Sequence, residues 1–206
     1  MMNGKLSSKL LILISSIGGV LALVLLFLPT LSAEYSHTLS PKQLYNLPAL
    51  EVGDIILRKG VGIESAVIEK LSHHDYTHIG LVISTQPIII LHATPDDNPK
   101  KPNQVILSSF DEFLSHARKI AIKRFALSTQ QRDKIALEAP LWLGESFILS
   151  TDAKALYCTT LLERIFAPHI KLNLAYDYID VPAFKGAYLF PKAFYENTQS
   201  YVIFTH

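Results

Sequence analysis

An uncharged stretch near the amino end, Leu10 to Leu28, sets the strongest limit on how this chain folds. Its nineteen residues (LLILISSIGGVLALVLLFL) are enough for a helix to cross the hydrocarbon core of a membrane once. Two lysines precede the stretch and a proline ends it, and the small residues Thr30–Ala33 follow, a layout typical of a secretory signal. The sequence therefore predicts a signal peptide or a signal anchor over residues 1–33, and a buried core helix is the alternative.

The lysines on the amino side predict that this side stays in the cytoplasm. The rest of the chain is then exported, and it is either periplasmic or anchored to the inner membrane through residues 10–28. Residues 34–206 are enough for one domain with a substantial core. A signal peptide or anchor followed by a single domain is the predicted organisation.

Composition excludes several classes of function. Apolar residues make up 49% of the chain and charged residues 18%, which is typical of a globular protein. The net charge is +1 and there is no run of lysine and arginine, so nothing favours nucleic acid as a partner. A single cysteine, Cys158, excludes an internal disulfide and any zinc or iron–sulfur site that needs several cysteines.

Alternation of apolar and polar residues predicts a β-hairpin around Gln86–Pro87. Thr77–Ser84 has the pattern of a strand, and Ile88–Ala93 is its antiparallel partner. Opposed residue numbers in this hairpin should sum to 171–173, which brings His92 near His78.

The same kind of pattern predicts the other elements. Helices and an antiparallel sheet mix within one domain, so the predicted fold class is α+β. The expected elements are a Gly53–Asp54 turn with a strand to Leu57, a helix over Gly62–Leu71, a strand over Lys119–Phe125, a helix from Ser128 to about Leu143 whose end Pro140 disturbs, a loop over Gly144–Asp152, irregular structure over Tyr176–Gly186, and an edge strand over Tyr201–Phe204.

Cys158 stands where a short apolar run passes into a helical pattern, and Thr159 and Thr160 fall in the predicted first turn. Unpaired backbone N–H groups and the positive end of the helix dipole favour a thiolate there. Cys158 is thus a potential nucleophile, although a small buried apolar residue is the simpler interpretation.

A cysteine nucleophile needs a base and a polar group that orients the base. Of the eight histidines, His78 is the best placed, because it begins an apolar strand and Gly80 leaves the same face open. His92 is second, and a neutral imidazole there can accept the N–H of His78. A buried, hydrogen-bonded structural histidine is the alternative for each.

A zinc site is a weaker alternative. His74 and His78 lie four residues apart with Asp75 between them, but this segment has the composition of a turn and not of a helix. No His-Glu-x-x-His pattern occurs. We therefore expect no metal and no other cofactor.

The order of these motifs resembles that of the permuted NlpC-type, papain-like cysteine hydrolases, and most closely the YiiX/YebB-like proteins. The motifs are Gly53-Asp54-Ile55-Ile56, Tyr76-Thr77-His78-Ile79-Gly80-Leu81-Val82, His92-Ala93 and Tyr157-Cys158-Thr159. The histidine precedes the cysteine, the reverse of the ordinary papain order. The resemblance spans about Leu50 to Phe166 and implies a circularly permuted papain-like fold, an antiparallel sheet packed with helices.

By this resemblance Cys158 is the nucleophile, His78 the base and His92 the third polar residue, with Asp54, Tyr76 and Tyr157 near the substrate. Turn and packing roles are the alternatives for those last three. Thr159–Thr160 departs from the Ser-Glu that is common in the family, and the loop after Gly144 lacks the usual Tyr-Asp. Both departures affect the substrate contacts more than the nucleophile.

The resemblance implies an exported amidase or peptidase that transfers an acyl group to water, with a peptidoglycan peptide or a lipid-derived amide or ester as substrate. A lipid acyltransferase or thioesterase on the same fold is one alternative. A non-catalytic ligand-binding module is a second, and a membrane-anchored structural protein that depends on residues 10–28 is a third.

Overall fold

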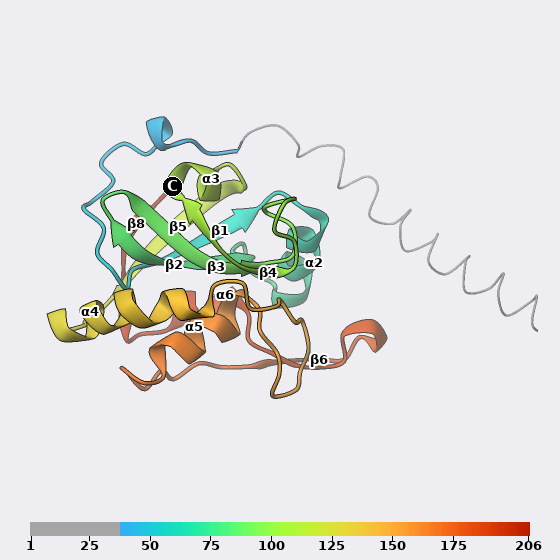
Figure 1. Cartoon of the computed structure of the whole chain (residues 1–206). Helices are drawn as coiled ribbons and strands as arrows, with labels where there is room; N and C mark the ends of the chain where they lie inside the picture. Colours follow the sequence, from blue (N-terminus) through green and yellow to red (C-terminus); the bar gives the residue numbers. More distant parts are fainter. Residues whose placement is uncertain (1–37) are drawn as a thin grey trace, which may run out of the picture. The chain divides into compact units, whose positions relative to one another are not determined.

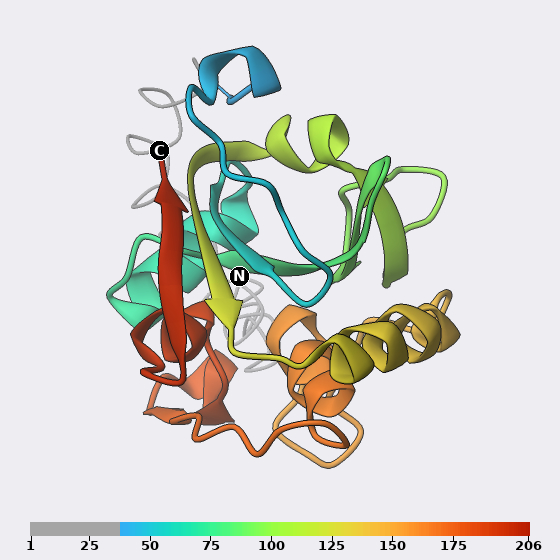
Figure 2. The same ribbon diagram turned by 90° about the vertical axis from the view of Figure 1, so that its left-hand side faces the viewer.

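Residues 38–206 are described by a computed structural model, and an antiparallel sheet of six strands lies at its centre. The strand order is β4-β3-β2-β1-β5-β8 (Figures 1 and 2). The strands are β1 (Ile55–Gly60), β2 (His78–Thr85), β3 (Ile88–Thr94), β4 (Gln104–Ser109), β5 (Ala117–Phe125) and β8 (Ser200–Thr205). The mixed α+β class is confirmed, as is the strand at the edge of the sheet near the carboxyl end.

The predicted hairpin is present in the expected register. Leu81 pairs with Leu91 and Val82 with Ile90, and the register shifts by one residue between Val82 and Ser84. The turn before β1 is also as expected, because Gly53 has φ 91°, a backbone conformation that glycine adopts without strain. These two features place His78, His92 and Arg58 on neighbouring central strands, with Arg58 directly paired to His78.

Helices cover both faces of the sheet. The core against one face includes α5 (Cys158–Phe166) together with parts of α4 (Thr129–Glu138) and α6 (Pro191–Glu196). The core against the other face includes α3 (Phe110–Leu114) and residues beside the short 3-10 helix η1 (Pro41–Gln43). In Figure 1, α4 and α5 lie below the sheet and α3 lies above it. The remaining helix, α2 (Ile63–Ser72), follows β1.

Proline limits the helix that begins after Ser128. The predicted capping box is present, since the Ser128 hydroxyl accepts a hydrogen bond from the Gln131 backbone N–H. The α-helix ends at Glu138, and Ala139–Trp142 continues as the 3-10 helix η2. Pro140 has no N–H for the helical hydrogen bond, so the α-helix gives way to a 3-10 turn there, which is the disturbance that the sequence predicts at the end of this helix.

The segment predicted to be irregular near the carboxyl end contains a small hairpin. Its strands are β6 (Asp177–Ile179) and β7 (Gly186–Tyr188), with the 3-10 helix η3 (Pro182–Phe184) between them. Three-residue strands are too short to give a periodic signal in the sequence.

The predicted signal or anchor over residues 1–33 lies outside the described residues and stays a prediction. Within residues 38–206, no helix is both long and apolar enough to cross a membrane.

Candidate active site

Cys158 is the first residue of α5, as the sequence pattern predicts. Tyr157 is the N-cap residue, and its backbone N–H donates to the Thr160 hydroxyl at 2.9 Å. Leu161, Leu162, Ile165 and Phe166 are buried and hold the helix against the sheet. Thr160, one of the two departures from the family motif, therefore has a local structural role as the partner of the cap.

Burial determines the acidity of the Cys158 thiol. Desolvation raises the pKa of Cys158 to about 11, while the backbone N–H groups of Ile79 and Thr159 act in the opposite direction. The expectation of a thiolate stabilised by the helix terminus is thus corrected: the helix terminus is present, but the loss of hydration is the larger effect. Cys158 is a neutral thiol near pH 7. It lies beside the backbone of Ile79, the residue that follows His78.

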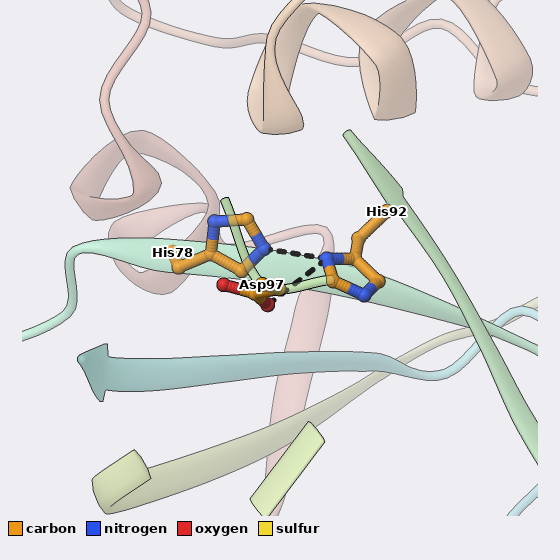
Figure 3. A group of neighbouring side chains, drawn as sticks. All are labelled: His78, His92 and Asp97. Carbon is orange, nitrogen blue, oxygen red and sulfur yellow. Dashed lines mark hydrogen bonds and ion pairs between the residues drawn. The ribbon is translucent and has the colours of Figure 1, made fainter. Parts of the chain in front are cut away.

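His78 and His92 are in direct contact. The Nε2 atom of His78 lies 2.9 Å from Nδ1 of His92, and Nε2 of His92 lies 3.0 Å from the hydroxyl oxygen of Ser108. The two rings stand edge to face, and the second nitrogen of His78 is on the side of its ring away from His92 (Figure 3). When both Nε2 atoms carry the proton, each donates to the next residue, and Nδ1 of His78 keeps a free lone pair.

Asp97 joins this pair, and the sequence analysis missed it. Its Oδ2 lies 3.7 Å from Nδ1 of His92 (Figure 3). The same oxygen lies 2.5 Å from Nη2 of Arg58. Nη1 of Arg58 donates to the backbone oxygen of Phe113 at 3.0 Å. Asp97 belongs to the Asp96–Pro102 segment, whose composition indicates a surface loop. No local pattern shows that this loop folds back over the sheet.

Both imidazoles are neutral at physiological pH. Burial lowers the pKa of His92 to about 3, and burial together with the Arg58 charge lowers the pKa of His78 well below its ordinary value. Burial acts to raise the pKa of Asp97, but the Arg58 charge and the imidazoles hold it well below its usual range. The site therefore combines two neutral imidazoles with a buried Arg58–Asp97 ion pair.

Cys158 and His78 line one cavity of about 320 Å³. It lies between α2, the loop after β3, the loop before α5 and the β6–β7 hairpin. Most of its lining surface is apolar, and it is formed by the aliphatic and aromatic side chains of Val67, Ile68, Leu71, Pro95, Phe147, Leu149, Tyr157, Phe184, Tyr188 and Phe190. The charged residues of the lining are Arg58, Glu64, Asp96 and Asp97. A cavity of this kind binds an apolar group and presents few polar atoms to it.

Tyr157 also lines this cavity, whereas Asp54 and Tyr76 do not. Asp54 is completely buried and accepts hydrogen bonds from Arg124 and from the Glu51 backbone. Asp54 thus holds the turn before β1, which is the alternative role that the sequence gives it.

Tyr76 packs with His74 and Tyr195 at a separate polar depression. Packing is the alternative role that the sequence gives Tyr76. Asp54 and Tyr76 belong to the sequence motifs at and before His78, but in the folded chain neither side chain lines the cavity that holds His78.

His78, His92 and Asp97 also form a potential metal site. Within the described residues, their ligand atoms form the one group of three or more such side chains that lie within 4.8 Å of one another. Two imidazole nitrogens and a carboxylate suit Zn²⁺, and the hydrogen bond from His92 to Ser108 is of the kind that orients a metal-bound histidine. Arg58 is bound to Oδ2 of Asp97 and would compete with a metal ion for this oxygen. The His74–His78 pair considered in the sequence is not this site.

No known family model matches the chain, and no curated protein sequence matches it. Among solved structures, the chain is similar to the metalloprotein YiiX from Escherichia coli O157:H7. The TM-score is 0.65 at 17% sequence identity, and the match covers 77% of this chain and 99% of YiiX. At this identity the likeness establishes the fold alone. The chain thus has a YiiX-like fold, as the order of its sequence motifs predicts.

Proposed function

We propose that this protein is a cysteine acyl hydrolase whose substrate places an apolar acyl group in the cavity beside Cys158. The observation that carries the proposal is that Cys158 and His78 line the same apolar cavity. A permuted papain-like arrangement, in which the histidine strand precedes the cysteine helix, agrees with the YiiX-like fold. A lipid-derived amide or ester suits this cavity better than a peptidoglycan peptide, whose polar groups would lack partners there.

The reaction starts from a neutral thiol and a neutral imidazole. Nδ1 of His78 takes the proton of Cys158 as the sulfur attacks the substrate carbonyl, and the His78 ring then gives this proton to the leaving amine or alcohol. The Cys158 thioester is cleaved by water, which the same imidazole deprotonates. The backbone N–H groups at the start of α5 face the developing oxyanion. Asp97 stabilises the positive charge that His78 acquires in each step.

The experiment is a chain-length series of acyl thioesters, with the acyl-enzyme detected by intact mass. The cavity has a finite volume of about 320 Å³ and can hold only a limited length of acyl chain. The rate should therefore rise with chain length and then level off. Cys158→Ala should abolish the adduct, and His78→Gln should slow its formation by roughly 10²-fold or more.

His74→Gln is the matched control, because His74 lies at the separate polar depression. This variant should leave the rate unchanged. Turnover that survives Cys158→Ala would overturn the proposal. Turnover that does not depend on chain length would exclude binding of the acyl group in the cavity. It would leave Cys158 as the nucleophile.

A metal-dependent activity is the second candidate, and the His78–His92–Asp97 group favours it. YiiX is described as a metalloprotein, which adds support. A bound Zn²⁺ would polarise a carbonyl and lower the pKa of its water. His78, His92 and Asp97 would hold the ion, and Ser108 would orient His92. Metal analysis of the purified protein, with His92→Gln as the variant, separates the two candidates: activity that persists after chelation supports the cysteine mechanism.

A further inference from the structure

We infer that the mouth of the cavity is a membrane-docking surface, whose partner is the apolar layer of a lipid bilayer. This inference rests on the proposed function, because an acyl lipid has to leave a bilayer to reach Cys158. We call this surface the mouth patch. It consists of Ile63, Leu149 and Val181, all of which are exposed to solvent.

Each residue of the mouth patch lines the cavity or belongs to a segment that does. Ile63 begins α2, and the next residue, Glu64, lines the cavity. Val181 precedes η3, whose Phe184 lines the cavity, and Leu149 is itself a lining residue. In Figure 1, α2 and the β6–β7 hairpin lie on the right-hand side of the domain. The apolar lining of the cavity therefore continues outward onto the surface.

The exposed fraction of the residues in the mouth patch is high for large apolar side chains. Ile63 is 62% exposed, Leu149 54% and Val181 43%. Exposed apolar residues beside an apolar cavity mark an interaction site more often than scattered ones do. A lipid bilayer accounts for both the exposed mouth patch and the apolar cavity, because it covers the patch and supplies an acyl chain to the cavity.

The sequence before the described domain supports the same occupant. The apolar stretch ends at Leu28 and the described domain begins at Thr38, so ten residue steps join them. Ten residues span at most about 36 Å. A chain anchored through residues 10–28 would hold the start of the domain, at Thr38, within this distance of the bilayer.

The test uses the full chain in phosphatidylcholine vesicles with Cys158→Ala, so that the only thiol is one introduced for labelling. A polarity-sensitive fluorophore is attached at Ile63→Cys or Val181→Cys, since neither residue lines the cavity. Both positions should show a blue shift, and lipids with a nitroxide on the acyl chain should quench them. Leu137→Cys is the matched control: Leu137 is apolar and 76% exposed, but it lies on α4 away from the mouth patch.

Equal emission and equal quenching at all three positions would overturn the inference. A blue shift at the mouth patch that appears without vesicles and grows with protein concentration would also overturn it, because a second copy of the chain would then be the occupant. Neither readout requires catalysis, so a failed acyl-hydrolase assay would leave the docking result interpretable.

A kinetic arm connects docking to the proposed function. The Ile63→Ser and Val181→Ser double variant should raise the apparent KM for an acyl ester in vesicles several-fold. It should leave the turnover of a short, water-soluble ester unchanged. An equal loss on both substrates would indicate damage to the site and would count against a docking role.

Discussion

His78 and His92, fourteen residues apart in the sequence, share a hydrogen bond of 2.9 Å between Nε2 and Nδ1. The contact exists because β2 and β3 pair as a hairpin in the register that the sequence predicts. Ser108, on the next strand, continues the chain of hydrogen bonds from His92. The site is thus a row of polar side chains across three neighbouring strands of an otherwise apolar sheet.

Removing His92 should reduce turnover because His78 would lose the partner that orients its ring. We expect His92→Ala to lower kcat by roughly 10²-fold or more. Ser108→Ala is the matched variant, since it removes one neutral hydrogen bond and should cost about 1 kcal/mol of stability with a smaller kinetic effect. Acyl-thioester kinetics and urea unfolding of both variants measure this. Equal kcat in the wild type and His92→Ala would exclude the orienting role.

The folded protein should lose stability in mild acid. The pKa of His92 is lowered to about 3 by burial, and the pKa of His78 is lowered in the same direction. A group with a depressed folded pKa contributes stability that is complete above its unfolded pKa of about 6.5 and is lost as the pH falls from there toward its folded pKa. The free energy of unfolding should therefore drop by up to about 1.4 kcal/mol per pH unit for each histidine. Urea titrations at several pH values, with His92→Gln as the comparison, test this, and a flat profile would contradict it.

Alkylation of Cys158 should be slow near neutral pH and should rise steeply in alkali. Burial raises the pKa of the thiol to about 11 from an ordinary 9.0, so the thiolate fraction at pH 8 should be about 100-fold below that of an ordinary cysteine. Iodoacetamide rates followed by mass from neutral to strongly alkaline pH measure this. A plateau reached near pH 7 would show instead that the helix terminus outweighs burial.

The Arg58–Asp97 pair should stabilise the loop after β3 against the sheet. Removing one partner leaves the other charge buried, so Asp97→Asn or Arg58→Met alone should cost about 3–5 kcal/mol. The double variant should recover part of this loss, because neither charge then remains unpaired. Urea unfolding of the three variants completes the cycle. Losses that simply add would show that the two side chains are not coupled.

Several features of the protein follow from the sequence alone. The alternation in Thr77–Ser84 and Ile88–Ala93 determines the hairpin and its register, since a one-residue slip would move every apolar side chain to the other face. The capping box at Ser128 determines where α4 begins, and the apolar spacing after Cys158 determines the buried face of α5. These are local signals. They were sufficient to bring His78 and His92 together and to place Cys158 at a helix terminus.

The tertiary structure decided which contacts each side chain makes. Asp97 reaches His92 only because a loop of polar composition folds back onto Arg58, a contact between residues 39 positions apart. Asp54 has the residue type of a substrate ligand, but Arg124 on β5 pairs with it in the core. The acidity of Cys158 depends on how much water the surrounding elements exclude. Burial and long-range charge are properties of the packed chain, so the pKa of the thiol and the apolar character of the cavity emerge only when the elements assemble.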